Sequence, residues 1–191
     1  MADGDDHPPD GSPCPDAASG LPAIGHPLAS ARDSVSLDDL RGRATITLGA
    51  GASSLSPAPL VDGSSCATLA PTNWGDPTHG GPCASWFPIV HATGDLSVVG
   101  GVGQGVLIVD GDLAASGDFS FVGAVIVAGA IRIGPGGTRL SGGVRAANVV
   151  DAGGANSAVP SVVRSSCALR RALLGTARMV AVRDRPWSAE R

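Results

Sequence analysis

The chain has 191 residues, a formal net charge of −4, 28 glycines, four cysteines and neither lysine nor tyrosine. This length fits a single domain, or one domain with an appendage. The negative charge and the lack of a basic run argue against binding to nucleic acid, and no apolar run reaches the roughly 18 residues of a membrane span.

Residues 1–35 are rich in Asp, Pro, Gly and Ser and contain few large apolar side chains. This composition predicts a disordered or loosely attached N-terminal segment. Its acidic start contains no apolar stretch of the kind that forms a signal peptide. Residues 36–93 predict an irregular cap with short strands, and Ala44–Leu48 is such a strand because β-branched residues alternate in it with small ones.

Two of the four cysteines, Cys66 and Cys83, bracket a loop rich in Pro, Gly and Trp. None of the four belongs to a C-x-x-C pair, which argues against zinc-ribbon and thioredoxin sites. We predict a Cys66–Cys83 disulfide, which would stabilise a loop of this length by on the order of 3 kcal/mol. Two unpaired thiols are the alternative. Trp74 and Trp86 lie inside the loop, and large aromatic residues there suit the closure of one end of a repeat array.

The segment from Gly94 to Ala147 contains nine six-residue units, in which a glycine is followed by apolar residues at alternate positions. Alternate apolar residues place their side chains on one face of a very short strand, and glycine suits the sharp corner between strands. The interleaved Val, Ile, Leu and Phe are too regular for a disordered glycine-rich tract. The predicted corner residues are Gly94, Gly100, Gly105, Gly111, Gly117, Gly123 and Gly129.

Units of this length wind into a parallel β-solenoid with three sides and about eighteen residues per coil. We therefore predict an all-β fold, with a short three-sided solenoid of about three coils over residues 94–150. The sequence leaves the handedness of the solenoid open. Strands such as Val106–Val109 are apolar on both faces, so one outer wall must be covered.

Residues 151–191 predict a C-terminal helix followed by a tail, and this helix is the nearest element to cover that wall. Ser161 is expected to be its N-cap, Gly175 lies near its end, and the helix is expected to run to Ala177. Its expected apolar face consists of Val162, Val163, Leu169, Leu173 and Leu174.

The residues that carry chemistry form no recognisable active site in the sequence. His91, at the entrance to the repeat, is the only candidate for a general base there, and we favour a structural role for it. Asp110, Asp112 and Asp118 cluster at corners, but the nine-residue spacing of a calcium-binding β-roll is missing, so we expect solvated carboxylates and no metal. The glycines of residues 101–105 miss the spacing of a dinucleotide fingerprint. We expect neither an enzyme nor a cofactor.

Two blocks of the sequence carry a family resemblance. One contains Cys66, Asn73–Pro77 and Cys83 and continues to Leu113, and the other comprises Ser165–Leu173 and Arg183–Trp187. Together they resemble the C-terminal β-solenoid region of PilX-type pilus-assembly proteins, a bacterial group found in Gemmatimonas-like genomes. Members of this group begin with a pilin-like membrane helix and expose a β-rich domain outside the inner membrane. This chain lacks that helix, which implies a fragment of a longer membrane-anchored protein or a start codon placed inside a longer gene.

The resemblance implies a compartment and a class of partner rather than a reaction. It implies the cell envelope, on its periplasmic or extracellular face, with pilus or envelope proteins as partners. Disulfides persist in such an oxidising compartment, so the resemblance also implies a Cys66–Cys83 bridge and allows a second bridge between Cys14 and Cys167.

We therefore expect a non-enzymatic structural or adhesive domain associated with a type IV pilus-like assembly, which binds through a solenoid wall or the Trp-rich cap. One alternative is a cytosolic polymer-forming scaffold like the bactofilins, whose short-repeat solenoids stack end to end. A second alternative is a hexapeptide-repeat acyltransferase, which resembles this chain in architecture only. Such an enzyme needs a histidine base beside its coils, and no histidine follows Gly94.

Overall fold

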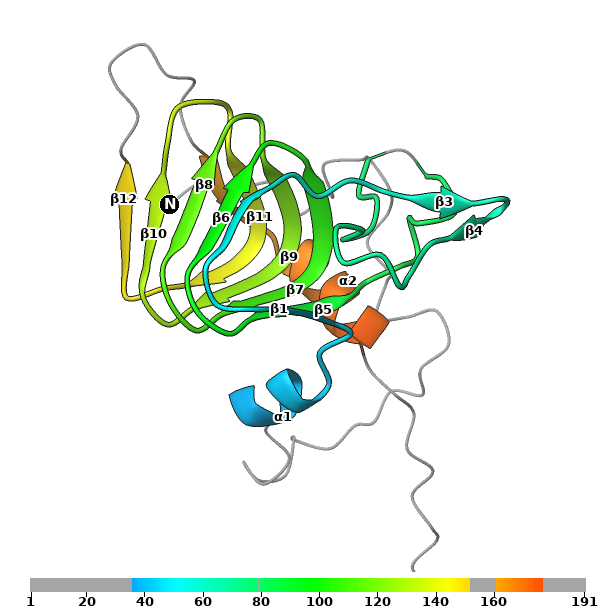
Figure 1. Cartoon of the computed structure of the whole chain (residues 1–191), viewed down its shortest axis with the longest axis horizontal. Helices are drawn as coiled ribbons and strands as arrows, with labels where there is room; N and C mark the ends of the chain where they lie inside the picture. The colour runs from blue at the N-terminus through cyan, green and yellow to red at the C-terminus, as the bar shows by residue number, and fades with distance from the viewer. Residues whose placement is uncertain (1–35, 79, 152–160, 177–191) are drawn as a thin grey trace, which may run out of the picture.

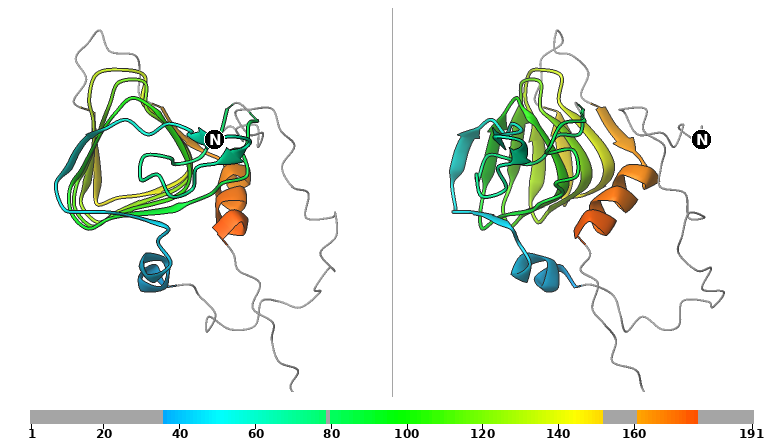
Figure 2. Two further views of the ribbon diagram at one scale, coloured as in Figure 1. Left: turned by 45° about the vertical axis from the view of Figure 1, so that its right-hand side comes forward. Right: turned by 90° about the vertical axis from the view of Figure 1, so that its right-hand side faces the viewer.

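The computed structural model describes residues 36–78, 80–151 and 161–176, which form a parallel β-solenoid of about four turns. The coils stack on a triangular outline, as the left view of Figure 2 shows, with one helix beside the solenoid and a shorter one below it. The predicted fold class is therefore confirmed. The solenoid is longer than residues 94–150, because strands on both sides of this segment complete further coils.

Two parallel sheets form the walls, and all their strand pairs are parallel (Figure 1). The six-stranded sheet contains, in spatial order, β1 (Ile46–Leu48), β5 (Ile89–Ala92), β7 (Val102–Val109), β9 (Ser120–Val127), β11 (Arg139–Arg145) and β13 (Ser161–Arg164). The five-stranded sheet contains β12 (Asn148–Asp151), β10 (Ala130–Ile133), β8 (Leu113–Ser116), β6 (Leu96–Val99) and β2 (Ala52–Leu55). A separate antiparallel hairpin consists of β3 (Val61–Asp62) and β4 (Ser65–Cys66).

The six-stranded sheet supplies two of the three walls, because β7, β9 and β11 each turn a corner. The first half of each long strand lies on wall A, where β11 pairs with β13. The second half lies on wall B, where β7 pairs with β5. The five-stranded sheet is wall C.

The corner between walls A and B requires glycine. Gly105, Gly123 and Gly142 stand in register there with φ of 104°, 142° and 135°. A Cβ atom at any of the three would also overlap a carbonyl oxygen of the preceding coil. Among the other predicted corner residues, Gly100 and Gly117 have positive φ, whereas Gly94, Gly111 and Gly129 do not. A Cβ on any of these last three would collide with the coil below, so there glycine provides space rather than conformational freedom.

Inward-facing side chains form ladders of matched apolar residues through the solenoid. On wall C, for example, Leu96, Leu113 and Ile131 lie in register and are fully buried. A second apolar cluster lies outside wall B, where Ile89, Val106, Ile108 and Ala124 pack against residues of both helices. The sequence predicted that one outer wall must be covered. The structure agrees, because helix α2 (Ser166–Thr176) packs against β7, β9 and β11.

The predicted helix boundary is wrong at its N-terminal end. Residues 161–164 form β13, because Val162 and Val163 are β-branched and extend the edge of β11, and the helix begins only at Ser166. Ser165 takes the capping role, since its Oγ accepts a hydrogen bond from the Ala168 N–H at 3.1 Å.

The predicted apolar face of this helix is also largely wrong. Val162, Val163, Leu173 and Leu174 are exposed, and Leu169 is partly buried. The buried side chains of α2 are the small ones, and they let the helix approach the glycine corner closely: Cys167, Ala168 and Ala172. A short helix that the sequence analysis did not anticipate, α1 (Leu37–Gly42), lies over the other side of wall B, with a capping box between Ser36 and Asp39.

Candidate functional site

The predicted cap is an insertion into wall A of the first coil. We define the cap as residues 56–88, which lie between β2 and β5. The Val102 N–H donates to the Pro57 carbonyl at 2.9 Å, and the Gln104 N–H donates to the Trp74 carbonyl at 2.8 Å. Pro57 and Trp74 thus occupy a strand position on wall A, and the chain between them leaves the solenoid and returns.

The Cys66–Cys83 disulfide is present, which confirms that prediction. It joins β4 to the returning part of the cap, and Cys83 is almost completely buried. Cys14 lies outside the described residues, so its pairing with Cys167 stays a prediction.

Asn73 organises the inside of the cap beside this disulfide. Its fully buried side-chain amide donates to the carbonyl oxygens of Leu60 and Ala67, both at 3.0 Å, and lies 3.2 Å from the Cys66 sulfur. Its Oδ1 accepts from the Gly75 N–H at 3.2 Å. A single buried side chain therefore holds the hairpin, the disulfide and the return turn together.

Trp74 closes the N-terminal end of the solenoid from the inside. Its side chain is fully buried, and its ring meets Phe119 edge-on with a centroid distance of 6.3 Å. A Cβ atom on Gly103 would lie 3.0 Å both from the Trp74 Cβ and from the Phe121 ring. Gly103 thus leaves the space that the aromatic rings of the neighbouring coils fill. Trp86, the second predicted cap aromatic, is only partly buried and donates to the Asn73 carbonyl at 3.3 Å.

Gln104 fastens the cap to wall A. It is almost completely buried, although it lies in the middle of the apolar strand β7. Its Nε2 lies within hydrogen-bond distance of the carbonyl oxygens of Cys83, Ala84 and Trp86, at 3.2, 2.9 and 2.9 Å. These contacts connect the last part of the cap to the second coil.

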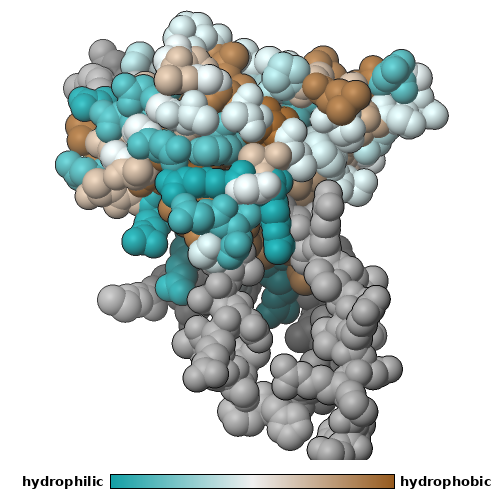
Figure 3. Space-filling model, turned by 60° about the horizontal axis from the view of Figure 1, so that its bottom comes forward, coloured by the Kyte–Doolittle hydropathy of each residue, from teal (hydrophilic) through white to brown (hydrophobic). Residues whose placement is uncertain are grey.

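The outer surface of the cap carries exposed apolar side chains. Leu69 is 97% exposed, Val61 is 57% exposed, and Leu60, next to Val61 in the chain, is also exposed. We call these three residues the cap tip. Figure 1 shows hairpin β3–β4 projecting beyond the first coil, and Figure 3 shows brown, hydrophobic residues on the same right-hand end of the molecule. Exposed apolar side chains on an internally rigid projection are a feature of protein-binding surfaces.

His91 lies on the outside of wall B in a polar network that holds α1. Its Nε2 lies 2.8 Å from Asp110 Oδ2, while Arg41 of α1 donates to Asp110 Oδ1 from Nη2 at 2.7 Å and from Nε at 3.0 Å. Partial burial acts to raise the pKa of Asp110, but the hydrogen bonds from His91 and Arg41 outweigh it and hold that pKa below its ordinary value.

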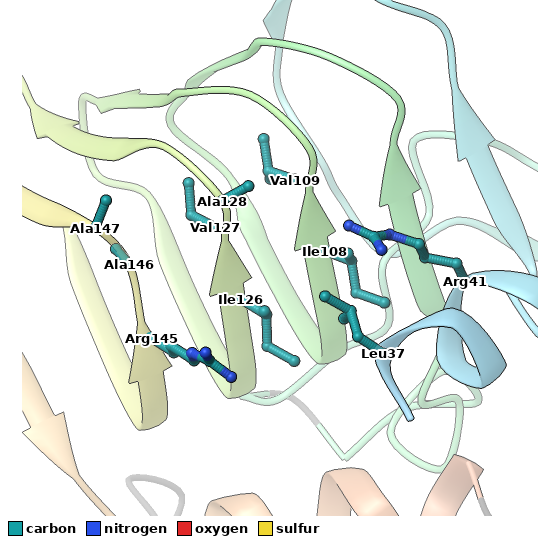
Figure 4. A pocket seen from close by; sticks show the side chains of 10 residues that line it. All are labelled: Leu37, Arg41, Ile108, Val109, Ile126, Val127, Ala128, Arg145, Ala146 and Ala147. Carbon is teal, nitrogen blue, oxygen red and sulfur yellow. The ribbon is translucent and has the colours of Figure 1, made fainter. Parts of the chain in front are cut away.

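A groove of about 350 Å³ runs along wall B beside this network (Figure 4). Its floor is formed by outward-facing residues of β7 and β9, and its rim carries two arginines. The lining residues are Leu37, Arg41, Ile108, Val109, Ile126, Val127, Ala128, Arg145, Ala146 and Ala147. His91 is not among them, although its register neighbour Ile108 and its network partner Arg41 are.

Two of the three predicted corner aspartates, Asp112 and Asp118, bond to the backbone rather than only to solvent. Asp112 accepts a hydrogen bond at 2.8 Å from the Ala130 N–H of the following coil, and Asp95, which was not predicted, accepts one at 2.8 Å from the Asp112 N–H. Asp118 accepts from the Gly137 N–H at 3.2 Å. The bond from the Ala130 N–H, and then the one from Arg132, lower the pKa of Asp112. The described residues contain no group of His, Cys, Asp or Glu side chains that suits a metal ion.

These features define a disulfide-bonded, capped parallel β-solenoid. Comparisons with family models, with curated proteins and with solved structures found no match to this chain. No helix in the described ranges is long and apolar enough to cross a membrane. The resemblance to PilX-type proteins therefore stays a prediction, and the string Arg183–Trp187 on which it partly rests lies outside the described residues.

Proposed function

We propose that this chain is a non-enzymatic structural domain of the cell envelope, associated with a type IV pilus-like assembly. In this proposal the solenoid is a rigid support for the cap, and the cap tip is the surface that contacts an envelope or pilus protein. The sequence resemblance to PilX-type proteins supports this class of partner.

The observation that carries the proposal is the contrast between the inside and the outside of the cap. Inside, the disulfide, Asn73 and Gln104 fix the backbone by independent contacts. Outside, Leu69 and Val61 are left to solvent. A preorganised apolar surface loses little conformational entropy when it binds, which favours recognition of a partner.

The disulfide supports the location. Cytosolic thiols are kept reduced, whereas bridges such as Cys66–Cys83 persist in the periplasm and outside the cell. The test is to alkylate free thiols in intact cells before lysis and then to map peptides without reduction. An unmodified Cys66–Cys83 bridge is the expected result, and alkylation of both residues in native cells would overturn the envelope location.

The partner surface is tested separately, by site-specific photo-crosslinking in cells from Leu69. Val99 on wall C is the matched control, since it is also apolar and 47% exposed but does not belong to the cap. We expect a discrete crosslink to an envelope protein from Leu69 and none from Val99. Identical crosslinking from both positions would contradict a binding role for the cap tip.

A polymer-forming scaffold is the second candidate. The edge strands β12 and β13 favour it, because each pairs on one side only within the described part of the chain. The cap over the first coil counts against end-to-end stacking at that end. Electron micrographs of purified protein that show long filaments would make this function the better one.

An acyltransferase finds less support in the geometry. His91 is engaged by Asp110 and does not line the groove on wall B. Titration of the purified protein with acetyl-CoA tests this alternative, and we expect no binding heat.

A further inference from the structure

Both helices pack on the outside of wall B, the wall that contains the groove. Leu37 and Leu40 of α1 and Leu169 of α2 pack against the same outer apolar cluster. The groove has Leu37 at one side and Ile108 and Ile126 on its floor (Figure 4). A segment of chain that connects the two helices therefore has this groove within its reach.

Residues 15–35 are such a segment, because the sequence and the disulfides connect them to both helices. At one end they lead into Ser36, the N-cap of α1. At the other end they follow Cys14. Cys167 of α2 is disulfide-bonded. Since the cap disulfide uses two of the four cysteines, Cys14 is the only one in the chain that remains as the partner of Cys167.

We call residues 15–35 the strap. Its 21 residues span at most about 70 Å when fully extended, which is ample for the distance between two helices on one wall. Attachment at both ends holds the strap near wall B at an effective concentration on the order of 1 mM. A modest apolar contact is therefore enough to keep it in the groove.

The side chains of the strap complement those of the groove. Leu21, Ile24 and Leu28 lie in the middle of the strap, and the prolines beside them favour an extended backbone. These side chains match the apolar floor. On the rim, Arg145 is exposed and has no ion-pair partner among the described residues. Asp16 of the strap supplies a carboxylate of the opposite charge.

The first part of α2 lies beside the coil that carries this arginine. A Cβ atom on Gly143 of β11 would lie 3.3 Å from Leu169, and Arg145 follows two residues later on the same strand. Asp16 is two residues from the cysteine that anchors the strap to this helix. The anchor therefore places the carboxylate near the arginine.

We propose that the strap lies across wall B, with Leu21, Ile24 and Leu28 in the groove and Asp16 paired with Arg145. The groove is then an intramolecular binding site, which the strap keeps closed to other ligands. This inference is independent of the cap tip, so its failure leaves the proposed function untouched.

The covalent anchor is tested by peptide mapping of the purified full chain without reduction. We expect a peptide that contains Cys14 to be joined to one that contains Cys167. Free thiols at both positions would overturn the proposal, because the strap would then have no attachment to α2.

The position of the strap is tested by photo-crosslinking within the same chain. A photoreactive residue in place of Ile24 is expected to crosslink to β7, β9 or the end of β11. Pro8 is the matched control position, because it is also N-terminal to α1 but lies before the anchor Cys14. From Pro8 we expect at least several-fold less crosslinking to these strands. Crosslinks from Ile24 to wall C or to a second copy, or none within the chain, would overturn the proposal.

The ion pair is tested by reversing the charge on the rim. Arg145→Glu is expected to lower the yield of the Ile24 crosslink by about twofold or more, because it repels Asp16. Arg139→Glu is the matched control, since Arg139 is also exposed and lies at the other end of β11, on wall A. Equal yields from the unaltered chain and both variants would overturn the pairing of Asp16 with Arg145.

Discussion

The two ends of the solenoid are made of the same kind of coil but differ in how deeply their last inward-facing side chains are buried. At the N-terminal end, Trp74 is fully buried, Ile46 and Leu48 are buried, and Leu55 on wall C is partly buried. At the C-terminal end, Val149 and Val162 occupy equivalent inward-facing positions and remain about half exposed.

The difference shows what closing a solenoid end requires. The repeating residues of a wall cannot close the end of the solenoid, because each side chain fills only the layer between two neighbouring coils. The N-terminal end instead uses Trp74, whose ring reaches past Gly103 to contact Phe119 of a later coil. Holding that ring in place takes an insertion with its own disulfide and its own buried amides.

Removal of the Trp74 ring should break the closed end most severely. Trp74→Ala is expected to lower the free energy of unfolding by about 3–5 kcal/mol, because a fully buried ring leaves a cavity among Phe119, Phe121 and Gly103. Trp86→Ala is the matched control and should cost clearly less, since Trp86 is only partly buried. Chemical denaturation followed by circular dichroism measures both variants. Equal losses would show that Trp74 has no special role in closing the end.

Removal of the disulfide is expected to have the next largest effect. The double variant Cys66→Ala, Cys83→Ala should lose on the order of 3 kcal/mol, because the unfolded chain is no longer constrained by a loop of this length. The measurement is the urea midpoint under non-reducing conditions, compared with that of the unaltered chain. An unchanged midpoint would mean that Asn73 and Gln104 hold the cap without the bridge.

A variant of Gln104 distinguishes the attachment of the cap to wall A from the internal stability of the cap. Gln104→Glu keeps the shape but has no side-chain N–H, so the carbonyls of Ala84 and Trp86 lose their donor. We expect a loss of more than about 1–3 kcal/mol, because a carboxylate is also buried against carbonyl oxygens, and faster amide exchange in the cap. Exchange in β10, on wall C, serves as the internal control and should not change. Uniformly faster exchange in the cap and in β10 would contradict a local role.

The Asp110 network predicts how acid affects the side of the molecule that carries α1. The folded-state pKa of Asp110 lies below its ordinary value of 3.8, so the unfolded chain takes up this proton first as pH falls. The stabilisation is therefore complete above the ordinary pKa and is lost as pH falls below it through the folded-state pKa. Asp110→Asn should flatten this acid dependence of unfolding. Asp38→Asn is the control, because Asp38 also pairs with Arg41 but is 89% exposed. An equally flattened profile for this variant would contradict the assignment of the acid dependence to Asp110.

The sequence predicted the solenoid well where each wall position repeats after eighteen residues. It did not predict the first coil, because the insertion of the cap separates Pro57 from Trp74 and interrupts the period on wall A. The predicted apolar face of α2 was wrong because the sequence pattern favours its leucines, whereas the fold buries its alanines. Close approach to Gly123 favours the small side chain of Ala172, which no hydrophobic pattern reveals.

In the cap, the disulfide was predictable from the loop that its cysteines bracket. Gln104 was missed, although its signal is visible as the one polar residue with a side-chain amide inside the apolar run of β7. Asn73 gave no comparable signal, since asparagine before a glycine turn is ordinary in loops. Its role depends on Leu60 and Ala67, which the fold brings to it from other parts of the cap.

The smallest expected effect belongs to the open end. Val162→Ala should cost below about 0.5 kcal/mol in dilute protein, because half of the side chain is already in solvent. Leu140→Ala, one coil earlier in the same ladder, is the matched control and should cost about 2–5 kcal/mol. Chemical denaturation followed by circular dichroism measures both variants. Equal losses would contradict the description of this end as open, because they would show that Val162 is packed as tightly as Leu140.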